Sequence, residues 1–259
     1  MRKIIAVANQ KGGVGKTTTT MSIGAALAKQ GKRILLVDLD PQGNLSEYLG
    51  YEGKTSTINE LLMETAAGKT IEPSQCVCHS TAENLDYIPA TLTLSNSDML
   101  LFTAMNRETV LRRVFLQEAF AVYDYIFIDC LPSLGILTIN AFAAANSVII
   151  PVQTQKFAVD GINSLMNVLQ MVRQQLNPQL VLEGILLTMA DHTNMSKAVS
   201  NALTEEYREL VFSTAISRST EAANSSYSQR SLVSYANKLG KEYDSLAKEL
   251  LAKECHNGT

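Results

Sequence analysis

Residues 10–18 combine three glycines with two lysines and two threonines, directly after the apolar run 4–8. A strand that leads into a glycine-rich loop and then a helix can hold phosphate groups. The loop N–H groups converge on the anion, and the helix N-terminus adds positive charge. In this arrangement Lys16 reaches the β- and γ-phosphates, and the Thr17 hydroxyl lies on Mg²⁺. The pattern predicts a nucleotide-phosphate site formed by Lys11, Gly12, Gly13, Val14, Gly15, Lys16, Thr17 and Thr18.

The loop departs from the pattern G-x-x-x-x-G-K-[ST] at its first position, where Gln10 replaces glycine and Lys11 follows it. A lysine at the start of the loop cannot easily fold back onto the phosphates that its own loop holds. One physical use of Lys11 is to reach the nucleotide of a facing subunit, as arginine fingers do. The alternative is a chance glycine- and lysine-rich turn, which the preceding strand and the following helix disfavour.

Three aspartates close two apolar runs, at the sheet edge where parallel α/β proteins bind ligands. Strand alternation places Asp38 and Asp40 on the same side. In phosphate-loop proteins an aspartate at the end of an apolar strand usually holds Mg²⁺, directly or through waters, and Asp129 has this position. We expect Asp38 to help order the metal and the loop, and Asp40 to orient or activate the attacking water. The alternative is that one of the pair only caps a turn or a helix.

Strand and helix signals alternate along the chain. This alternation predicts a doubly wound, mostly parallel α/β sheet with helices on both faces and ligand loops at the carboxyl ends of the strands. Strands are expected at 4–8, 33–38, 85–89, 125–129, 147–152, 181–189 and 211–216. Helices are expected at 17–30, 44–49, 57–64, 94–105, 108–120, 159–176, 196–207 and 232–253. No linker or repeat interrupts the pattern, so we expect one domain over residues 1–259, closed by the C-terminal helix.

The bulk composition is that of an ordinary globular protein, with 46% hydrophobic and 18% charged residues. The net charge of −3 argues against a surface coated in positive charge, but it leaves room for a local basic patch. No apolar run approaches the ~20 residues of a membrane span, and no signal-peptide pattern precedes the first strand. The cysteines lack the spacing of a disulfide framework, which favours a reducing cytosol. Cys76, Cys78 and His79 lack a second ligand pair, which disfavours a metal site there.

Three segments in this order, 11–18 (KGGVGKTT), 37–44 (VDLDPQGN) and 128–135 (IDCLPSLG), resemble the ParA/Soj family of deviant-Walker-A partition ATPases. Further matching segments are 85–90 (LDYIPA), 149–153 (IIPVQ) and 184–189 (GILLTM). The resemblance covers residues 1 to about 190 closely and the remainder loosely. It implies the fold of a P-loop NTPase with a deviant Walker A loop.

The resemblance further implies that the protein binds ATP and Mg²⁺ and forms a nucleotide-sandwich homodimer, in which Lys11 contacts the partner's phosphates. By the same resemblance Lys16, Thr17 and Asp40 match the family's phosphate lysine, metal hydroxyl and hydrolytic aspartate. The dimer would bind double-stranded DNA without sequence preference and release it after hydrolysis, which a ParB-like protein stimulates. Such a cycle would move or space plasmids, chromosomes or a mobile element. The protein would be cytoplasmic and nucleoid-associated when ATP is bound.

The segments that bear DNA contacts in the family differ here. Residues 217–230 lack the family's usual Pro-Arg and Gly-Lys and include Glu221, and His192 stands near a common arginine position. Leu131 replaces the first of two prolines in a loop that responds to the nucleotide in the family. Candidate DNA contacts are Lys197, Arg218 and Arg230, and the alternative for each is an ordinary solvated side chain. From the geometry of the sheet, Thr188, Met189 and the loop after residue 216 are expected at the adenine.

Other members of the superfamily are weaker matches. A MinD-like ATPase that positions a membrane or protein cargo would end in a basic amphipathic helix. Here the tail has an apolar stripe at Leu239, Tyr243, Leu246 and Leu250 and a polar face of mixed charge, which favours docking on the core rather than stable membrane binding. A reductase of the nitrogenase iron-protein type would need paired cluster cysteines. A non-enzymatic DNA-binding scaffold is disfavoured by the intact Lys16, Asp40 and Asp129.

Overall fold

Strands and helices alternate along almost the whole chain. The structure is a computed structural model that describes residues 2–69, 71–155 and 158–257. The strands are β1 (Lys3–Val7), β2 (Ile34–Leu39), β3 (Cys78–Ser80), β4 (Leu85–Ile88), β5 (Tyr125–Cys130), β6 (Ser147–Gln153) and β7 (Val181–Thr188). The α-helices are α1 (Lys16–Lys29), α2 (Asn44–Tyr48), α3 (Ile58–Ala66), α4 (Ser95–Leu101), α5 (Val110–Phe115), α6 (Ile136–Ala144), α7 (Ala158–Gln175), α8 (Asn194–Tyr207), α9 (Glu221–Tyr227) and α10 (Lys238–Asn257).

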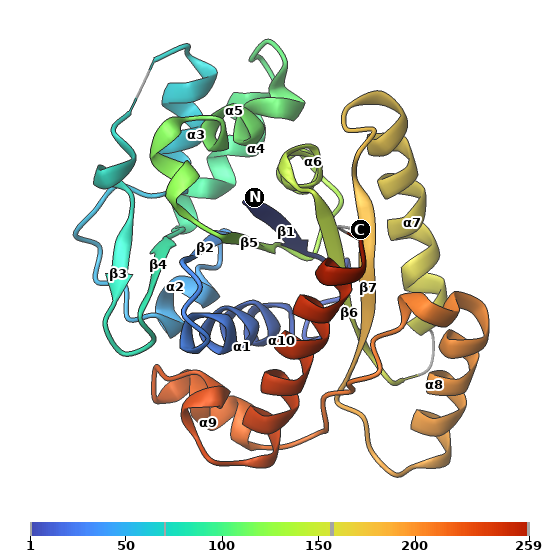
Figure 1. The fold of residues 1–259 in the computed structure, drawn as a ribbon. Helices are drawn as coiled ribbons and strands as arrows, with labels where there is room; N and C mark the ends of the chain where they lie inside the picture. The colour runs from blue at the N-terminus through green and yellow to red at the C-terminus, as the bar shows by residue number, and fades with distance from the viewer. Residues whose placement is uncertain (1, 70, 156–157, 258–259) are drawn as a thin grey trace.

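The strands form one sheet in the order β3-β4-β2-β5-β1-β6-β7 (Figure 1). The pairs along this order are parallel except β3 with β4, which run antiparallel at one edge. Helices cover both faces, with α1 and α10 on one side and α3 to α7 on the other (Figure 1). The predicted doubly wound, mostly parallel sheet is therefore confirmed.

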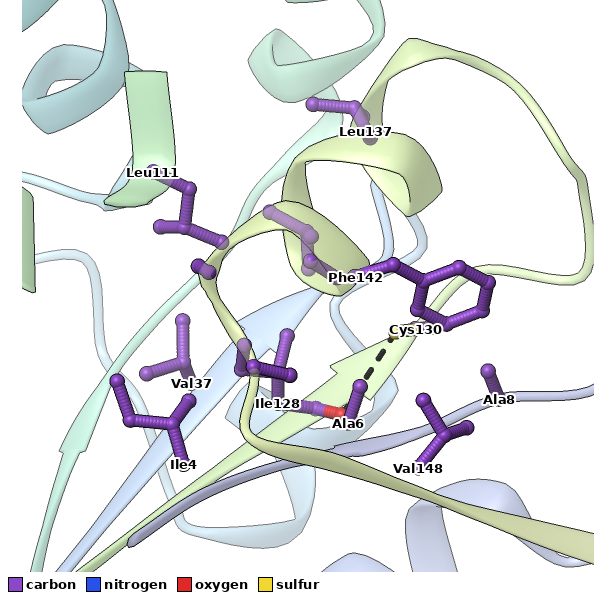
Figure 2. Close-up of a cluster of buried hydrophobic side chains, with 14 of the residues drawn as sticks. Ile4, Ala6, Ala8, Val37, Leu111, Ile128, Cys130, Leu137, Phe142 and Val148 are labelled. Atoms are coloured by element: carbon purple, nitrogen blue, oxygen red, sulfur yellow. Dashed lines mark hydrogen bonds between the residues drawn. The ribbon is translucent and has the colours of Figure 1, made fainter. Parts of the chain in front are cut away.

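The central strands are apolar up to the aspartates near their carboxyl ends, because helices cover them on both faces. Every residue of β2 and β5 is buried. Figure 2 shows the side of the sheet covered by α6, where Phe142 and Leu137 lie over residues of the central strands such as Ile128 and Val148. Burying each such large side chain contributes about 1.5–3 kcal/mol. The core on this face thus fixes the strands whose ends carry the predicted site.

The opposite face is closed by the C-terminal helix. Leu239, Tyr243, Leu246 and Leu250 of α10 are all buried, in the same hydrophobic cluster as residues of α1. The Tyr243 hydroxyl lies 3.2 Å from Thr19 Oγ1 of α1. The predicted apolar stripe therefore faces the core. Among the described residues, no helix is both long and apolar enough to cross a bilayer.

The prediction of a strand at 211–216 was wrong. This segment pairs with β7 discontinuously: Ile185 and Val211 form an isolated bridge, and the N–H groups of Phe212 and Ile216 donate to the carbonyls of Ile185 and Leu187 at 3.0 and 2.8 Å. The backbone N–H groups of Ser213 and Thr214 donate instead to the two oxygens of the Glu249 carboxylate, at 2.7 and 3.0 Å. A side chain from α10 thus takes the hydrogen bonds that a regular strand would need.

Other boundaries also differ from the sequence prediction. The closing helix, predicted from residue 232, begins at Lys238, because Leu232–Ser234 form a short 3₁₀ turn and the Asn237 side chain accepts the Gly240 N–H at 2.7 Å. The two helices predicted at 94–105 and 108–120 are shorter, at α4 and α5. Strand β3 and helices α6 and α9 were not predicted.

Gly184 in β7 lies where the chain is tightly packed. A Cβ added at Gly184 would lie 2.6 Å from a Phe212 ring carbon and 3.0 Å from the Leu210 carbonyl oxygen. We expect Gly184→Ala to lower the free energy of unfolding by about 1–3 kcal/mol, because overpacking forces the neighbours to shift. Gly161→Ala in α7 is the control, since a Cβ there meets nothing within 4 Å. Urea unfolding measures both, and equal stability of the two variants would contradict this packing.

Candidate nucleotide site

The parallel register brings the predicted residues to one edge of the sheet. Asp38 of β2 pairs with Asp129 of β5, and Val7, the last residue of β1, pairs with Asp129 on the other side. The loop that follows β1 therefore emerges beside the two carboxylates. Residues 112 positions apart in sequence meet here, since Thr17 Oγ1 donates to Asp129 Oδ2 at 2.7 Å.

The phosphate loop is shaped by glycine conformations. Gly13 and Gly15 have φ angles of +71° and +89°, which side-chain-bearing residues rarely adopt. A Cβ added at either glycine, or at Gly12, would meet nothing within 4 Å. Asn9 fixes the start of the loop, since its Nδ2 donates to the Pro151 carbonyl at 2.7 Å and its Oδ1 accepts the Lys11 N–H at 2.9 Å. The sequence did not point to Asn9, because one of its partners, Pro151, is distant in sequence and the other is a backbone N–H group.

Lys16 is buried although it carries a charge. Its Nζ donates to the Lys11 carbonyl at 3.4 Å. Burial lowers the pKa of Lys16, whereas the nearby Asp129 carboxylate acts in the opposite direction. A buried ammonium with a single long hydrogen bond is electrostatically suited to a bound anion. Lys11, by contrast, is exposed at the outer side of the loop.

Asp129 is buried beneath the loop and beside Thr17. Burial, followed by the neighbouring Asp38 carboxylate, raises the pKa of Asp129 to about 8, against an ordinary value of 3.8. The Thr17 hydrogen bond and Lys16 act against this shift. A carboxyl that holds its proton near neutral pH must release it when a cation binds, so cation binding at Asp129 would be coupled to proton release.

The Asp38 carboxylate is held by hydrogen bonds from residues that follow it closely in the chain. Its Oδ2 accepts the backbone N–H and the hydroxyl of Ser46 at 2.9 and 2.7 Å, and its Oδ1 accepts the Asp40 N–H at 3.1 Å. Burial nevertheless raises the pKa of Asp38 to about 6. Asp40 has a more open carboxylate, whose Oδ1 accepts the Gln42 N–H at 3.0 Å. Asp38 thus orders the turn that presents Asp40, and Ser46 is a partner that the sequence pattern did not reveal.

A cavity of about 480 Å³ lies next to the loop. Its lining comprises Gly15, Thr18, Thr188, Met189, Ile216, Ser217, Arg218, Ser219, Thr220, Ala222, Leu232, Leu239 and Tyr243. The two residues predicted at the adenine, Thr188 and Met189, are among them. Thr188 Oγ1 donates to the Val14 carbonyl at 2.9 Å, which joins the wall of the cavity to the phosphate loop. The contributions of α10 were not foreseen, because they come from the far end of the chain.

The candidate DNA-contact residues lie on separate elements. Lys197 is on α8, Arg218 follows the bridge at Ser217, and Arg230 follows α9. All three are exposed. Arg218 also lines the cavity, and its Nε lies 3.5 Å from Asp191 Oδ2. A single molecule therefore offers dispersed positive charge in this region rather than one compact basic patch.

Known proteins match this chain over nearly its full length. A family profile described as an AAA domain matches residues 2–182. The sporulation initiation inhibitor protein Soj of Bacillus subtilis is 41% identical, with 97% of this chain and 99% of that protein covered. The chromosome partitioning protein ParA of Myxococcus xanthus is 39% identical, with 97% and 89% covered.

The fold is also shared with a solved structure that holds a nucleotide. It is the crystal structure of cobyrinic acid a,c-diamide synthase from Mycobacterium smegmatis with bound ADP and magnesium. The similarity has a TM-score of 0.83 at 36% identity and covers 97% of this chain and 94% of that chain. The similarity therefore includes the segment after residue 190, where the sequence motifs are sparse.

The raised pKa of Asp129 makes stability depend on pH. A carboxyl with a higher pKa in the folded than in the unfolded protein binds its proton more tightly when folded. It therefore opposes folding increasingly as pH rises from about 4 to 8. We expect the free energy of unfolding of the nucleotide-free protein to fall between pH 6 and 8.5. In Asp129→Asn this fall should be smaller by at least about 1 kcal/mol. Denaturant unfolding across this range tests it, and parallel curves for the two proteins would contradict the assignment.

Proposed function

This chain belongs to the ParA/Soj family of P-loop partition ATPases, and from that membership and the geometry of its site we propose a function. We propose that it dimerises around ATP and Mg²⁺, binds double-stranded DNA without sequence preference while ATP is bound, and releases the DNA after slow hydrolysis. The observation that carries the proposal is the contact between Thr17 and Asp129 beneath the phosphate loop, with Lys16 and Asp40 beside it. We infer that the cargo is a chromosome, a plasmid or a mobile element, and that a ParB-like protein stimulates turnover.

The residues of the site fit ATP and Mg²⁺. The glycine loop is open where phosphate oxygens would approach its N–H groups, and the buried Lys16 supplies a positive charge. Among the described residues no three His, Cys, Asp or Glu side chains are arranged to hold a metal by themselves. This fits Mg²⁺, which keeps several waters and takes one or two protein ligands together with phosphate oxygens. Thr17 and Asp129 would hold the ion, with Asp38 ordering the turn behind it.

The bound Mg²⁺ would neutralise charge that develops on the phosphates during transfer. The chain's own residues supply positioning. Lys16 binds the β- and γ-phosphates, and the cavity wall at Thr188 and Met189 receives the adenine. Asp40, on the turn that Asp38 fixes, orients the attacking water. The exposed Lys11 reaches the phosphates of the facing subunit, so that ATP joins the two protomers.

DNA binding requires the dimer on electrostatic grounds. The chain has a net charge of −3, and its candidate contacts Lys197, Arg218 and Arg230 are dispersed. Each contact with a phosphate adds a modest, salt-sensitive increment. Pairing two protomers doubles the number of contacts that one DNA segment can make, so affinity rises steeply with dimerisation. Hydrolysis, by separating the protomers, lowers affinity without any change in the contacts themselves.

The alternative of a MinD-like ATPase with a membrane or protein cargo receives less support. The apolar residues of α10 that would have to enter lipid are buried against the core. The similarity to the M. smegmatis synthase does not lead us to propose amide synthesis for this chain. Of the cysteines whose side chains are described, Cys76 and Cys130 are buried, and burial raises the pKa of both thiols, which disfavours a role as nucleophile. The third, Cys78, is half-buried and lies on the edge strand β3.

Asp40 and Lys11 have separable roles in this proposal. Asp40→Ala should lower the rate of ATP hydrolysis by about 100-fold or more, while ATP affinity changes little. Lys11→Ala should bind ATP but remain monomeric by light scattering, because the bridging charge is lost. Lys69→Ala is the control, since Lys69 is an exposed lysine that pairs with Glu64. Retained hydrolysis in Asp40→Ala, or ATP-dependent dimers of Lys11→Ala, would remove the residue from its role.

Nucleotide-dependent DNA binding tests the function itself. Binding to random-sequence duplex DNA should be about tenfold or more tighter with ATP than with ADP or no nucleotide. It should persist in Asp40→Ala. Affinity should fall with salt, with a log–log slope of about −0.9 for each neutralised phosphate. Arg230→Ala should weaken binding and reduce the slope, whereas Lys54→Ala, an exposed residue paired with Glu52, should not. Equal binding in every nucleotide state, or none at all, would contradict the proposal.

A further inference from the structure

Helix α2 joins the catalytic turn to a distant segment of the chain. It starts four residues after Asp40 and contains only Asn44–Tyr48. Ser46 faces Asp38, and Tyr48 contacts residues of the segment 222–231. These residues are more than 170 positions away in sequence. We refer to Ser46, Tyr48 and Ser225 as the α2 bridge.

The first end of the α2 bridge is tied to the aspartate pair. Both the backbone N–H and the hydroxyl of Ser46 donate to Asp38 Oδ2, while Asp38 Oδ1 accepts the N–H of Asp40. All of these groups are buried, where hydrogen bonds are strong and costly to leave unmade. The Ser46 hydroxyl also accepts the Ala90 N–H at 2.8 Å. A displacement of the Asp40 turn therefore has to be accommodated by α2.

The other end of the bridge reaches both the cavity and the Arg230 segment. The Tyr48 hydroxyl lies 2.6 Å from Ser225 Oγ and 3.3 Å from the Arg230 carbonyl oxygen. Ser225 Oγ lies 2.9 Å from the Ala222 carbonyl oxygen, and Ala222 lines the cavity. Since each hydroxyl has one proton, two arrangements are possible: Tyr48 donates to Ser225 while Ser225 donates to Ala222, or Ser225 donates to Tyr48 while Tyr48 donates to the Arg230 carbonyl. Tyr48 and Ser225 are both buried, so water does not replace these contacts.

The segment also has a second anchor that is independent of α2. Glu83, which precedes β4, is buried, and its carboxylate accepts the N–H of Ser231 at 2.7 Å and the hydroxyl at 2.6 Å. Between the two anchors lies Gln229, which has a φ angle of +51°, a conformation that is uncommon for residues other than glycine. A segment held at both ends changes shape between them when one anchor shifts, and Arg230 lies there.

We propose that Tyr48 is a positioning residue that couples the nucleotide state of the Asp38–Asp40 turn to the placement of Arg230. The coupling is carried by two buried contacts, Ser46 with Asp38 and Tyr48 with Ser225, which the short helix α2 joins through its backbone. It rests on the proposed function, because the relevance of Arg230 depends on DNA binding. It adds a specific route by which the state of one site biases the other within a single protomer.

Tyr48→Phe tests the coupling, since it removes one hydroxyl and keeps the buried ring. Tyr51→Phe is the matched control, because its hydroxyl donates to the Thr55 carbonyl and has no part in the α2 bridge. The first measurement is hydrogen exchange of peptides covering 222–234, with ATP and with ADP, in the Asp40→Ala background. We expect exchange to differ between the two nucleotides, and the difference to disappear in Tyr48→Phe and persist in Tyr51→Phe. Ser46→Ala, at the other end, should also abolish it.

The second measurement is the ratio of DNA affinities with ATP and with ADP. This ratio should fall by about fivefold or more in Tyr48→Phe, with ATP affinity and dimerisation close to those of Tyr51→Phe. A merely structural role would lower DNA affinity equally with both nucleotides and would overturn the proposal. The proposal would also be overturned if hydrogen exchange of 222–234 in the parent protein were the same with ATP and with ADP. If the parent shows nucleotide-dependent exchange but binds no DNA, the proposed function fails while the coupling stands.

Discussion

The arrangement of charge at one edge of the sheet constrains the rest of this structure. Asp38 and Asp129 are paired across neighbouring strands and buried, and Lys16 is buried beside them. Burial raises the pKa of both carboxyls, to about 8 for Asp129, and lowers that of the lysine, so burial disfavours the charged form of each group. Ser46 already satisfies Asp38, whereas in the proposed complex an anion would compensate Lys16 and a divalent cation would compensate Asp129. The covered sheet and its two cores hold the two carboxyls in place against their mutual repulsion.

The same constraint explains how the site is divided among elements. The phosphate loop supplies N–H groups and Lys16, β5 supplies Asp129, and β2 supplies the turn that presents Asp40. Helix α10 and the segment after β7 line the cavity beside the phosphate loop. The Asp38–Asp40 turn is tied to the segment 222–231 through Ser46 and Tyr48 of α2. In the proposed coupling, these contacts link the nucleotide state to the placement of Arg230.

Sequence alone predicted what is local and repetitive. The phosphate loop, the strand-end aspartates and the parallel sheet follow from short motifs and apolar runs, and the apolar stripe of α10 follows from helical spacing. The features that were missed depend on distant partners: Glu249 withdraws 213–214 from the sheet, Ser46 satisfies Asp38, and Glu83 holds Ser231. Such pairings leave no periodic signal, because one polar side chain at a given position has many potential partners.

We infer that the buried Asp129 carboxyl exchanges its proton for the cation of the nucleotide complex. Titration calorimetry with Mg–ATP at pH 7, in buffers of different ionisation enthalpy, measures the protons released on binding. We predict that the wild type releases more protons than Asp129→Asn, by close to one per site, because a group with a pKa of about 8 is mostly protonated at this pH. Equal proton release by the two proteins, with nucleotide bound in both, would contradict the account.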